Sequence, residues 1–222
     1  GCPSGTVFSK GKGSGLLRDS DGLERFLDGI FADPPLPISL KTRLGVAEAA
    51  EFPRLLEIYN RYPVKLLIIH PRVRKAFYDG PVDMDAFAYA LENSKNPLCF
   101  NGNLCSREDV HRFSERYPSV SSAMLGRGLI GAPGMFAPNG TTPAALEAFC
   151  DELLDGYTSL FGGARNAMFR LKENWRYLIR LFEGAERPGK QLRKTTDAAQ
   201  YRSLTHEIIR NCPMRENLAP DW

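Results

Sequence analysis

Polar and glycine residues stand at the ends of four apolar segments whose composition is typical of β-strands. They are Lys41 and Arg43 in the first segment, His70 and Arg72 after the second, Asn101 to Asn103 after the third, and Gly126 to Gly128 after the fourth. In parallel α/β folds, functional side chains gather at the carboxyl ends of the strands. Their recurrence at four successive strand ends therefore predicts a binding or catalytic site.

Glycine in two of these loops predicts contact with a phosphate group. Backbone N–H groups approach a phosphate closely where the residue has no side chain, and Arg127 would add charge-assisted hydrogen bonds. A lone Gly126-Arg127-Gly128 is more often a simple turn. Its pairing with Asn101-Gly102 after the neighbouring strand is what favours phosphate.

Lys41 and His70 each have two interpretations. A lysine within a strand either lies on a sheet edge, where it is solvated, or points into a barrel. Inside a barrel its ammonium needs an acceptor, such as the edge of a flavin ring. His70 ends a strongly apolar strand, and by itself it fits a structural histidine better than a ligand-binding one.

Cys2 is the cysteine placed best for chemistry. It lies in a Gly-Cys-Pro loop, whereas Cys99 and Cys150 lie in apolar segments that favour the core. A thiol in such a loop acts as a proton donor or as a nucleophile when its surroundings tune it. Without that tuning, an incidental loop cysteine is the more frequent case.

The elements that carry these residues alternate along the chain. Strands are predicted over residues 38–44, 64–69, 97–100 and 122–125, and helices over 16–30, 47–61, 84–94 and 106–117. Ser106 is the expected N-cap of the last helix, with Asp109 in its first turn. Strand–helix alternation predicts a parallel sheet with right-handed crossovers, in a doubly wound fold or a (β/α) barrel.

Residues 141–222 have a different character. Helices are predicted over 143–160, 164–182 and 201–212, and no strand candidate remains. Nine basic and three acidic residues lie between Arg165 and Lys194, a local net charge of +6 against +3 for the whole chain. We therefore expect an α/β domain over 1–140 and a helical domain over 141–222. The basic segment is interpreted equally as a nucleic-acid surface or as a solvated face.

Composition excludes several classes of protein. The 222 residues are 43% hydrophobic and 25% charged, which is typical of a globular protein and not of a disordered or collagen-like one. No apolar stretch approaches the ~20 residues that cross a bilayer. Five scattered cysteines with no CxxC pair argue against a zinc site or a disulfide framework. We expect a cytoplasmic protein in a reducing environment, without metal or membrane.

Five segments, in order, resemble the tRNA-dihydrouridine synthases, which are flavin-dependent (β/α)8-barrel enzymes. The segments are GCPSGTVFSKGKGSGLL (1–17), SLKTRLG (39–45), IIHPRVRKAFYDGP (68–81), NGNLCSREDV (101–110) and AMLGRGLIGAPGMF (123–136). Order and spacing agree along residues 1–140. The helical tail is similar to the RNA-binding C-terminal domain of that family.

The resemblance implies FMN as cofactor, NADPH as its reductant and tRNA as partner, with reduction of the C5=C6 bond of particular uridines. It implies that Cys2 protonates the uracil from the face opposite the hydride donor. The residues that it implies for the cofactor are Lys41, His70, Asn101, Gly102, Asn103, Gly126 and Arg127, and those for the substrate are Arg43, Arg72 and Tyr78. Hydride arriving at C6 leaves enolate-like charge on the uracil, and a thiol with the ordinary pKa of ~8.5 is a protonated donor at neutral pH.

In that family the Gly-Cys-Pro loop follows the fourth barrel strand. The resemblance thus implies that residues 1–140 hold strands five to eight, the second half of a (β/α)8 TIM barrel, followed by a small all-α domain. A complete barrel takes ~250 residues, so we expect a fragment of a longer protein. The parent is expected to be monomeric, and the isolated chain to self-associate through its open sheet edges.

Two other functions remain open from the sequence. Another FMN-dependent barrel oxidoreductase, of the dihydroorotate dehydrogenase type, would not need the basic helical segment. A non-catalytic RNA-binding remnant would keep the helical domain without the chemistry. A flavin absorbance spectrum separates these functions.

Overall fold

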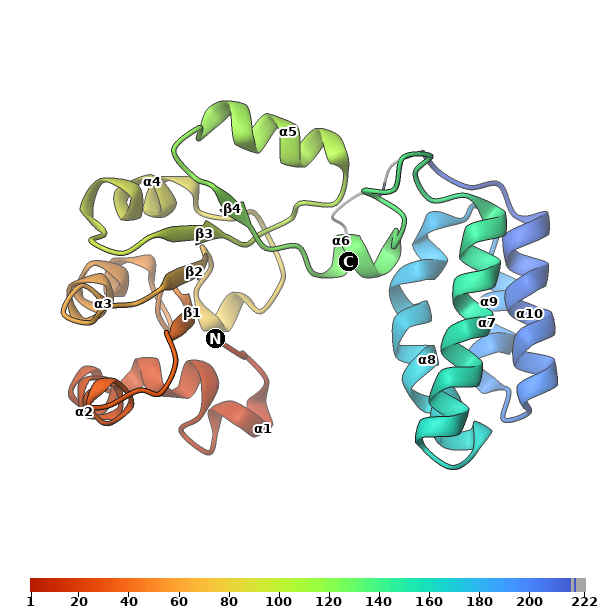
Figure 1. Ribbon diagram of the computed structural model, residues 1–222, viewed down its shortest axis with the longest axis horizontal. Helices are drawn as coiled ribbons and strands as arrows, with labels where there is room; N and C mark the ends of the chain where they lie inside the picture. The colour runs from red at the N-terminus through yellow and green to blue at the C-terminus, as the bar shows by residue number, and fades with distance from the viewer. Residues whose placement is uncertain (217, 219–222) are drawn as a thin grey trace. The chain divides into compact units, whose positions relative to one another are not determined.

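A four-stranded parallel sheet organises the first part of the chain in the computed structural model, which describes residues 1–216 and 218 (Figure 1). Its order is β1 (Ser39–Arg43), β2 (Leu66–His70), β3 (Leu98–Phe100) and β4 (Ser122–Ala123). All three pairings are parallel, so the predicted parallel α/β arrangement is confirmed. The predicted extension of the fourth strand to Leu125 is wrong, because pairing with β3 ends at Ala123.

The chain divides into two compact units. The first contains residues 1–103 and 113–124, and the second contains residues 104–112 and the described residues from 125 onward. Helix α5 (Arg107–Arg116) contributes residues to both. All four strands belong to the first unit.

Helices separate the strands as the sequence predicts. They are α3 (Phe52–Tyr59) after the 3-10 turn η2 (Ala49–Glu51), then η3 (Arg74–Ala76) and α4 (Met84–Asn93), then α5. The segments before β1 are α1 (Gly5–Phe8), η1 (Gly13–Arg18) and α2 (Ser20–Phe31). The single helix predicted over 16–30 is therefore wrong. Asp19 interrupts it with an extended backbone (φ −130°, ψ 100°), which ends η1 and begins α2.

The predicted cap of α5 is present. Ser106 Oγ accepts a hydrogen bond from the Asp109 amide at 3.0 Å, and the Asp109 carboxylate accepts one from the Ser106 amide at 3.0 Å. This reciprocal pair satisfies two N–H groups that a helix start leaves without intrahelical partners.

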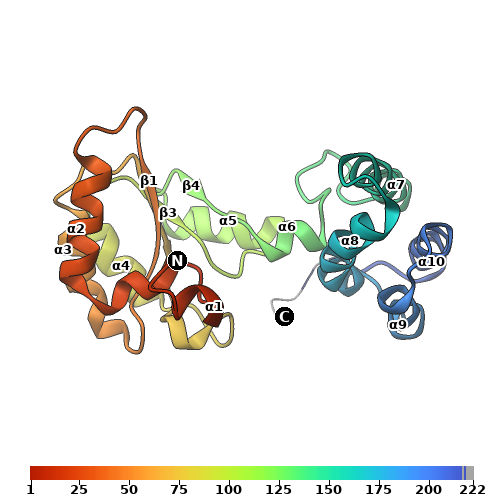
Figure 2. The ribbon, with the colours of Figure 1, turned by 90° about the horizontal axis from the view of Figure 1, so that it is seen from below.

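Apolar packing covers one face of the sheet. Phe100 of β3 stacks on Phe113 with ring centroids 4.4 Å apart, and meets Phe87 of α4 edge-on at 5.0 Å. On the same face, the Thr42 hydroxyl and the Tyr59 hydroxyl are 2.8 Å apart, and burial raises the pKa of Tyr59 to about 12. Figure 2 shows α2, α3 and α4 on one side of the strands and α1 on the other.

The second unit is helical over its described residues. Its elements are α6 (Arg127–Gly131), α7 (Pro143–Leu160), α8 (Ala164–Leu178), η4 (Ile179–Leu181), α9 (Glu186–Lys194) and α10 (Ala198–Asn211), together with the start of α5. The apolar residues of α8 recur at helical spacing, and Met168, Leu171, Trp175 and Leu178 are all buried in one core. Within the described part of the chain, no helix is both long enough and apolar enough to cross a bilayer.

Helix α9 was absent from the sequence prediction, which placed three helices after residue 141. Its nine residues include Pro188 and Gly189 beside several charged side chains, a composition typical of a loop. Pro188 is tolerated because it is the third residue of the helix, where its missing N–H would have no intrahelical acceptor. Leu192 is buried in the helical core and holds α9 in place.

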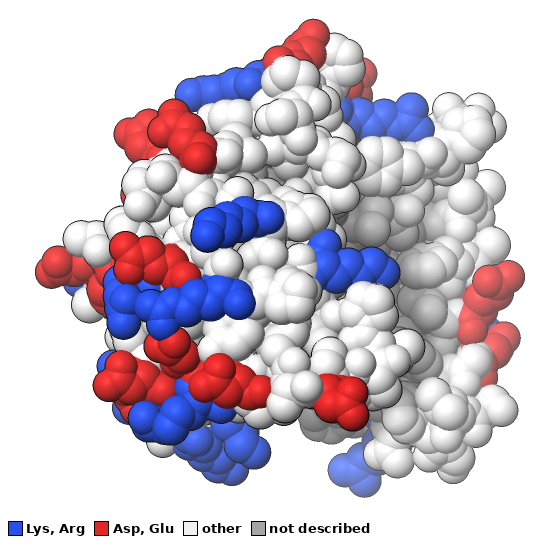
Figure 3. Space-filling model, turned by 60° about the vertical axis from the view of Figure 1, so that its left-hand side comes forward, with Lys and Arg blue, Asp and Glu red and all other residues white. Residues whose placement is uncertain are grey.

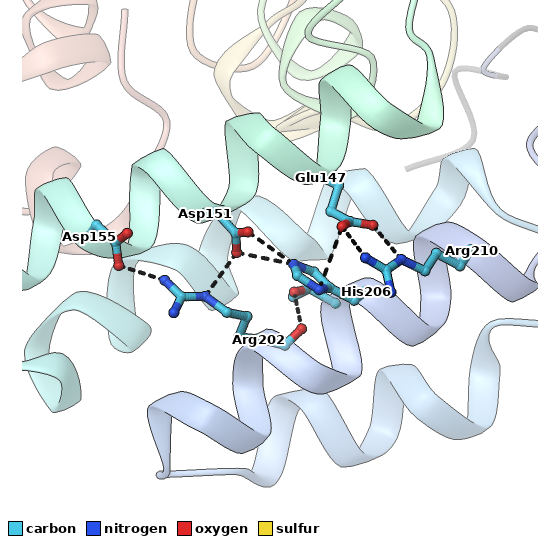
Figure 4. A network of polar contacts seen from close by, with 7 residues as sticks. Glu147, Asp151, Asp155, Arg202, His206 and Arg210 are labelled. Carbon is cyan, nitrogen blue, oxygen red and sulfur yellow. Dashed lines mark hydrogen bonds and ion pairs between the residues drawn. The ribbon is translucent and has the colours of Figure 1, made fainter.

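A network of ion pairs and hydrogen bonds joins α7 to α10 (Figure 4). Asp151 of α7 accepts from Arg202 Nε at 3.0 Å and lies 3.1 Å from His206 Nε2. Glu147, one turn earlier on α7, pairs with Arg210 and lies 3.7 Å from His206 Nδ1. His206 is thus placed between two carboxylates, and the side chains of Asp151 and Glu147 are only 33% and 21% exposed.

We expect Asp151→Ala to destabilise the helical unit by about 1 kcal/mol, because it leaves the Arg202 guanidinium and the His206 ring without their shared carboxylate. The control is Arg170→Ala, which removes an exposed pair with Glu173 on α8, and should cost less than about 0.5 kcal/mol. Urea unfolding followed by the fluorescence of buried Trp175 measures both. Equal effects of the two substitutions would contradict a network contribution.

Candidate functional site

The sheet face opposite the helices carries the predicted site residues of β1 and β2. Side chains alternate between the two faces of a strand, and parallel pairing places Lys41 beside Ile68 and Arg43 beside His70. Ile68 in turn pairs with Cys99 of β3. One row of side chains (Lys41, Ile68 and Cys99) therefore crosses this face, and a second row, Arg43 and His70, lies next to it toward the carboxyl ends of the strands.

Lys41 lies in the first of these rows, and the pKa of its ammonium is lowered. Its side chain is exposed, yet the protein atoms round the ammonium and the nearby Arg43 cation lower the pKa of Lys41 to about 8. Cys99 lies close enough for the two groups to interact, although burial raises the pKa of that thiol. The pairing places Lys41 on an edge strand of the described sheet, on the side away from the helices, so both of its predicted placements stay open.

Arg43 is the most deeply buried charge of the site, with 1% of its surface exposed. Its Nε donates to the Gly1 carbonyl at 3.2 Å and its Nη1 donates to the Val73 carbonyl at 3.0 Å. The Tyr78 ring lies over the guanidinium, 5.4 Å from its carbon. Burial lowers the pKa of Arg43, and Tyr78 opposes that effect. The side chain therefore ties the Cys2 loop to the loop after β2.

His70 and Arg72 form a buried pair at the end of β2. Arg72 Nη1 lies 3.0 Å from His70 Nε2, and the two residues are 3% and 5% exposed, respectively. Since a guanidinium only donates, Nε2 is the acceptor and the imidazole carries its proton on Nδ1. Arg72 also donates to the Gly80 carbonyl. Tyr78 is 47% exposed, and its ring lies 6.1 Å from that of His70.

Cys2 is exposed at the start of the loop that Arg43 holds. Pro3 beside it is buried, so the loop is anchored while the thiol stays accessible. Cys99 and Cys150 are buried, which confirms their predicted core positions.

In the segment Asn101 to Asn103, the first residue has a structural role, and the other two leave backbone and a side-chain oxygen available to a ligand. Asn101 Nδ2 donates to the Met124 carbonyl at 2.7 Å and joins the ends of β3 and β4. Gly102 has no room for a side chain, because a Cβ would lie 2.6 Å from Val82 Cγ1. Asn103 has a left-handed backbone (φ 44°), and its buried Oδ1 has no hydrogen-bond partner among the described residues.

Gly126 and Arg127 belong to the second unit, whereas Asn101 to Asn103 belong to the first. Gly126 precedes the first residue of α6, which is Arg127. Gly128 is buried, and a Cβ there would lie 2.5 Å from the Leu104 carbonyl oxygen. The pairing of the two glycine loops in one phosphate site stays a prediction.

Two residues near the site escaped the sequence prediction. The Arg74 guanidinium carbon lies 4.1 Å from the centroid of the Phe8 ring and 4.9 Å from that of Phe77, joining α1 to the loop after β2. Ser14 is completely buried against the Cys2 loop. Both fall inside segments that resemble the family (1–17 and 68–81), but residue type and spacing assigned neither a role, and Ser14 stands in a Gly/Ser/Lys stretch that is typical of a loop. The described residues contain no cluster of His, Cys, Asp or Glu able to hold a metal ion.

Comparison with known proteins identifies the relatives of this chain. It is 30% identical over 224 residues to a probable tRNA-dihydrouridine synthase of Staphylococcus aureus (strain MRSA252), covering 94% of this chain and 65% of that protein. It is 31% identical over 134 residues to a probable tRNA-dihydrouridine synthase of Rhizobium leguminosarum bv. phaseoli, covering 60% and 42%. It is 30% identical to tRNA-dihydrouridine synthase B of Shewanella oneidensis (strain MR-1), covering 61% and 42%.

The chain therefore spans less than two thirds of the length of these curated relatives. The family model described as dihydrouridine synthase matches residues 1–205. That match includes the Cys2 loop, all four strands and most of the helical unit. Since it extends over nearly the whole chain, the chain belongs to the dihydrouridine synthase family.

Proposed function

We propose that this chain carries the catalytic loop and part of the cofactor site of a tRNA-dihydrouridine synthase, which reduces the C5=C6 bond of uridine in tRNA with FMN and NADPH. The observation that carries the proposal is the exposed Cys2 thiol, on a loop tied by Arg43 to the strand that bears Lys41. A thiol on this loop would act as a proton donor beside a cationic strand end. The names of the relatives support the same reaction.

The residues present fit a flavin mononucleotide. Lys41 offers an ammonium whose pKa the surrounding protein atoms and Arg43 lower, and a flavin ring would supply acceptor atoms for it. Asn103 offers a buried carbonyl oxygen without a partner among the described residues, which suits a ribityl hydroxyl donor. Gly102, at the end of β3, leaves backbone accessible where a side chain would clash. We place His70 beside these as a neutral ring, and assign Asn101, Gly126 and Arg127 to the phosphate side.

A flavin held by these residues would supply the hydride for C6 of the uracil. Cys2 donates the thiol proton to C5, so that the charge left on the ring is quenched as it forms. Arg43 stabilises that charge through its buried cation and orients the loop that carries Cys2. Tyr78, half exposed over Arg43 and near His70, presents a ring on which the uracil can stack, and Arg72 holds the Tyr78 loop through Gly80.

For the fold, we propose that the four parallel strands are the second half of a (β/α)8 barrel. The face with Lys41 and His70 would line the barrel, and the helices that cover the other face would form its outer ring. Within the described residues β1 and β4 are the edges of the sheet. Unpaired edges of this kind favour association with another strand, and we place the protein in the cytoplasm.

For tRNA contact we propose a basic groove along α8 and α9 of the helical unit. Lys172, Arg176 and Arg193 line it beside Phe169, which is 72% exposed. The groove continues past Arg180, Lys190 and Arg215, with Glu173 and Glu186 as its acidic lining residues. A basic groove attracts a sugar-phosphate backbone, and an exposed aromatic ring beside it offers a surface on which a base can stack. By contrast, acidic and basic groups are interspersed on the face seen in Figure 3.

The first prediction for this function concerns the cofactor. FMN binding, followed by quenching of flavin fluorescence, should weaken by about tenfold between pH 7 and pH 10, because Lys41 loses its proton near pH 8 and with it a charge-assisted hydrogen bond. Lys41→Met should bind FMN weakly and without this pH dependence. Lys65→Met, an exposed lysine outside the site, serves as the control. A pH dependence that survives in Lys41→Met would contradict the assignment.

The second concerns the proton donor. Cys2→Ala should leave NADPH oxidation by the flavin unchanged, because that half-reaction transfers no proton to uracil. Reduction of tRNA uridine should fall by about 10²- to 10⁴-fold, the usual effect of losing a general acid. Cys212→Ala, which replaces a cysteine of the helical unit, is the control. Equal loss of both half-reactions would show that Cys2 supports folding or flavin binding instead.

The third concerns the groove. The double substitution Arg176→Glu with Arg193→Glu should weaken tRNA binding by at least about tenfold at low salt, and reduce the slope of log K against log salt by about 2. The matched control is Arg54→Glu with Arg61→Glu, two exposed arginines of the first unit. Filter binding across a salt series measures both. An equal loss of affinity in the control pair would show that the overall charge, and not this groove, determines tRNA binding.

A further inference from the structure

The backbone carbonyl of Cys2 is held by one residue, Ser14. Ser14 Oγ donates to the Cys2 carbonyl oxygen at 2.7 Å and the Ser14 amide donates to the same oxygen at 3.1 Å. Ser14 has 0% of its surface exposed, whereas Cys2 is exposed. The contact therefore anchors the main chain of the cysteine from the protein interior.

The peptide on the other side of Cys2 is also held. Arg43 donates to the Gly1 carbonyl at 3.2 Å, so both peptide planes that meet at the Cys2 Cα have a fixed hydrogen-bond partner. Since peptides are planar, fixing the two planes fixes the φ and ψ of the residue between them. Pro3 restricts the same residue to extended backbone. Only the χ1 torsion is left to move the thiol.

The segment that contains Ser14 is built closely around Cys2. Gly13 has a φ of 57°, and a Cβ there would lie 3.0 Å from the Cys2 carbonyl oxygen and 3.2 Å from the Cys2 Cβ. A side chain at position 13 would therefore push the cysteine outward. Gly13 allows the chain to approach Cys2 closely, and Ser14 adds its hydroxyl to its amide as a second donor to the Cys2 carbonyl.

We propose that Ser14 is the positioning residue for Cys2, and that its hydroxyl aims the thiol in the proton transfer; the inference rests on the function proposed above. Ser14 itself is not a proton donor to substrate, because it is fully buried and its hydroxyl is committed to a carbonyl. A small misplacement of a reacting group is enough to slow a reaction greatly. Ser14 therefore sets the rate of protonation without touching the uracil.

The test is Ser14→Ala in the full chain, which leaves a smaller side chain in the buried position and keeps the backbone donor. Amide hydrogen exchange should rise in residues 2–8 and stay unchanged in the strands. The turnover rate for tRNA uridine should fall by about tenfold, while KM for tRNA and the oxidation of NADPH by the flavin stay at their normal values. Ser9→Ala is the control, because Ser9 Oγ makes an exposed contact with the Thr6 carbonyl, in the same segment of chain.

Two results would overturn the proposal. One is unchanged exchange in residues 2–8 of Ser14→Ala. The other is an equal fall of uridine reduction and NADPH oxidation, which would mean that Ser14 supports the fold as a whole. If a protein that contains residues 1–222 together with the rest of the proposed barrel reduced no uridine, the proposed function would fail, and the exchange measurement on this chain would still decide whether Ser14 holds the Cys2 loop.

Discussion

A guanidinium buried at the carboxyl end of β1 ties three segments of the first unit together. Arg43 is 1% exposed and donates to the carbonyls of Gly1 and Val73, and the Tyr78 ring lies over it. A buried charge is costly unless its donors are satisfied. The Cys2 loop and the loop after β2 must therefore stay where they can accept from it, so one strand residue fixes the position of both loops.

The same arrangement holds the main chain of Cys2 in place and leaves its side chain able to rotate. Its neighbouring carbonyls are bound by Arg43 and Ser14, and Phe8, at the end of α1, is packed against Arg18 and Arg74. None of these contacts uses the sulfur. A reactive group must be reached by its substrate and also arrive in one geometry, and holding the backbone alone meets both requirements.

The helical unit depends on a different balance. Its apolar core gathers the buried side chains of α7, α8, α9 and α10, and the carboxylates of α7 then meet the cations of α10 at its surface. Burial of the apolar side chains is non-directional and supplies most of the stability of this unit. The ion pairs select the pairing of these two helices, because Asp151 and Glu147, one turn apart on α7, meet Arg202 and Arg210, which lie about two turns apart along α10.

The strands, most helices and the likeness to one enzyme family are determined by the sequence alone. Periodicity and turn residues are local signals, and α7 matches its predicted range of 143–160. Local signals failed at α9, whose Pro188 and Gly189 are overridden by burial of Leu192, and at Asp19, which divides a predicted helix. The residues that surround Cys2 were decided by tertiary structure. Ser14 and Arg43 are 12 and 41 positions away from it, and only the folding of the loop onto β1 brings their donors to the Cys2 and Gly1 carbonyls. Hydrogen bonds between residues distant in sequence leave no periodic trace in the chain, because they depend on where the elements pack and not on the spacing of residue types.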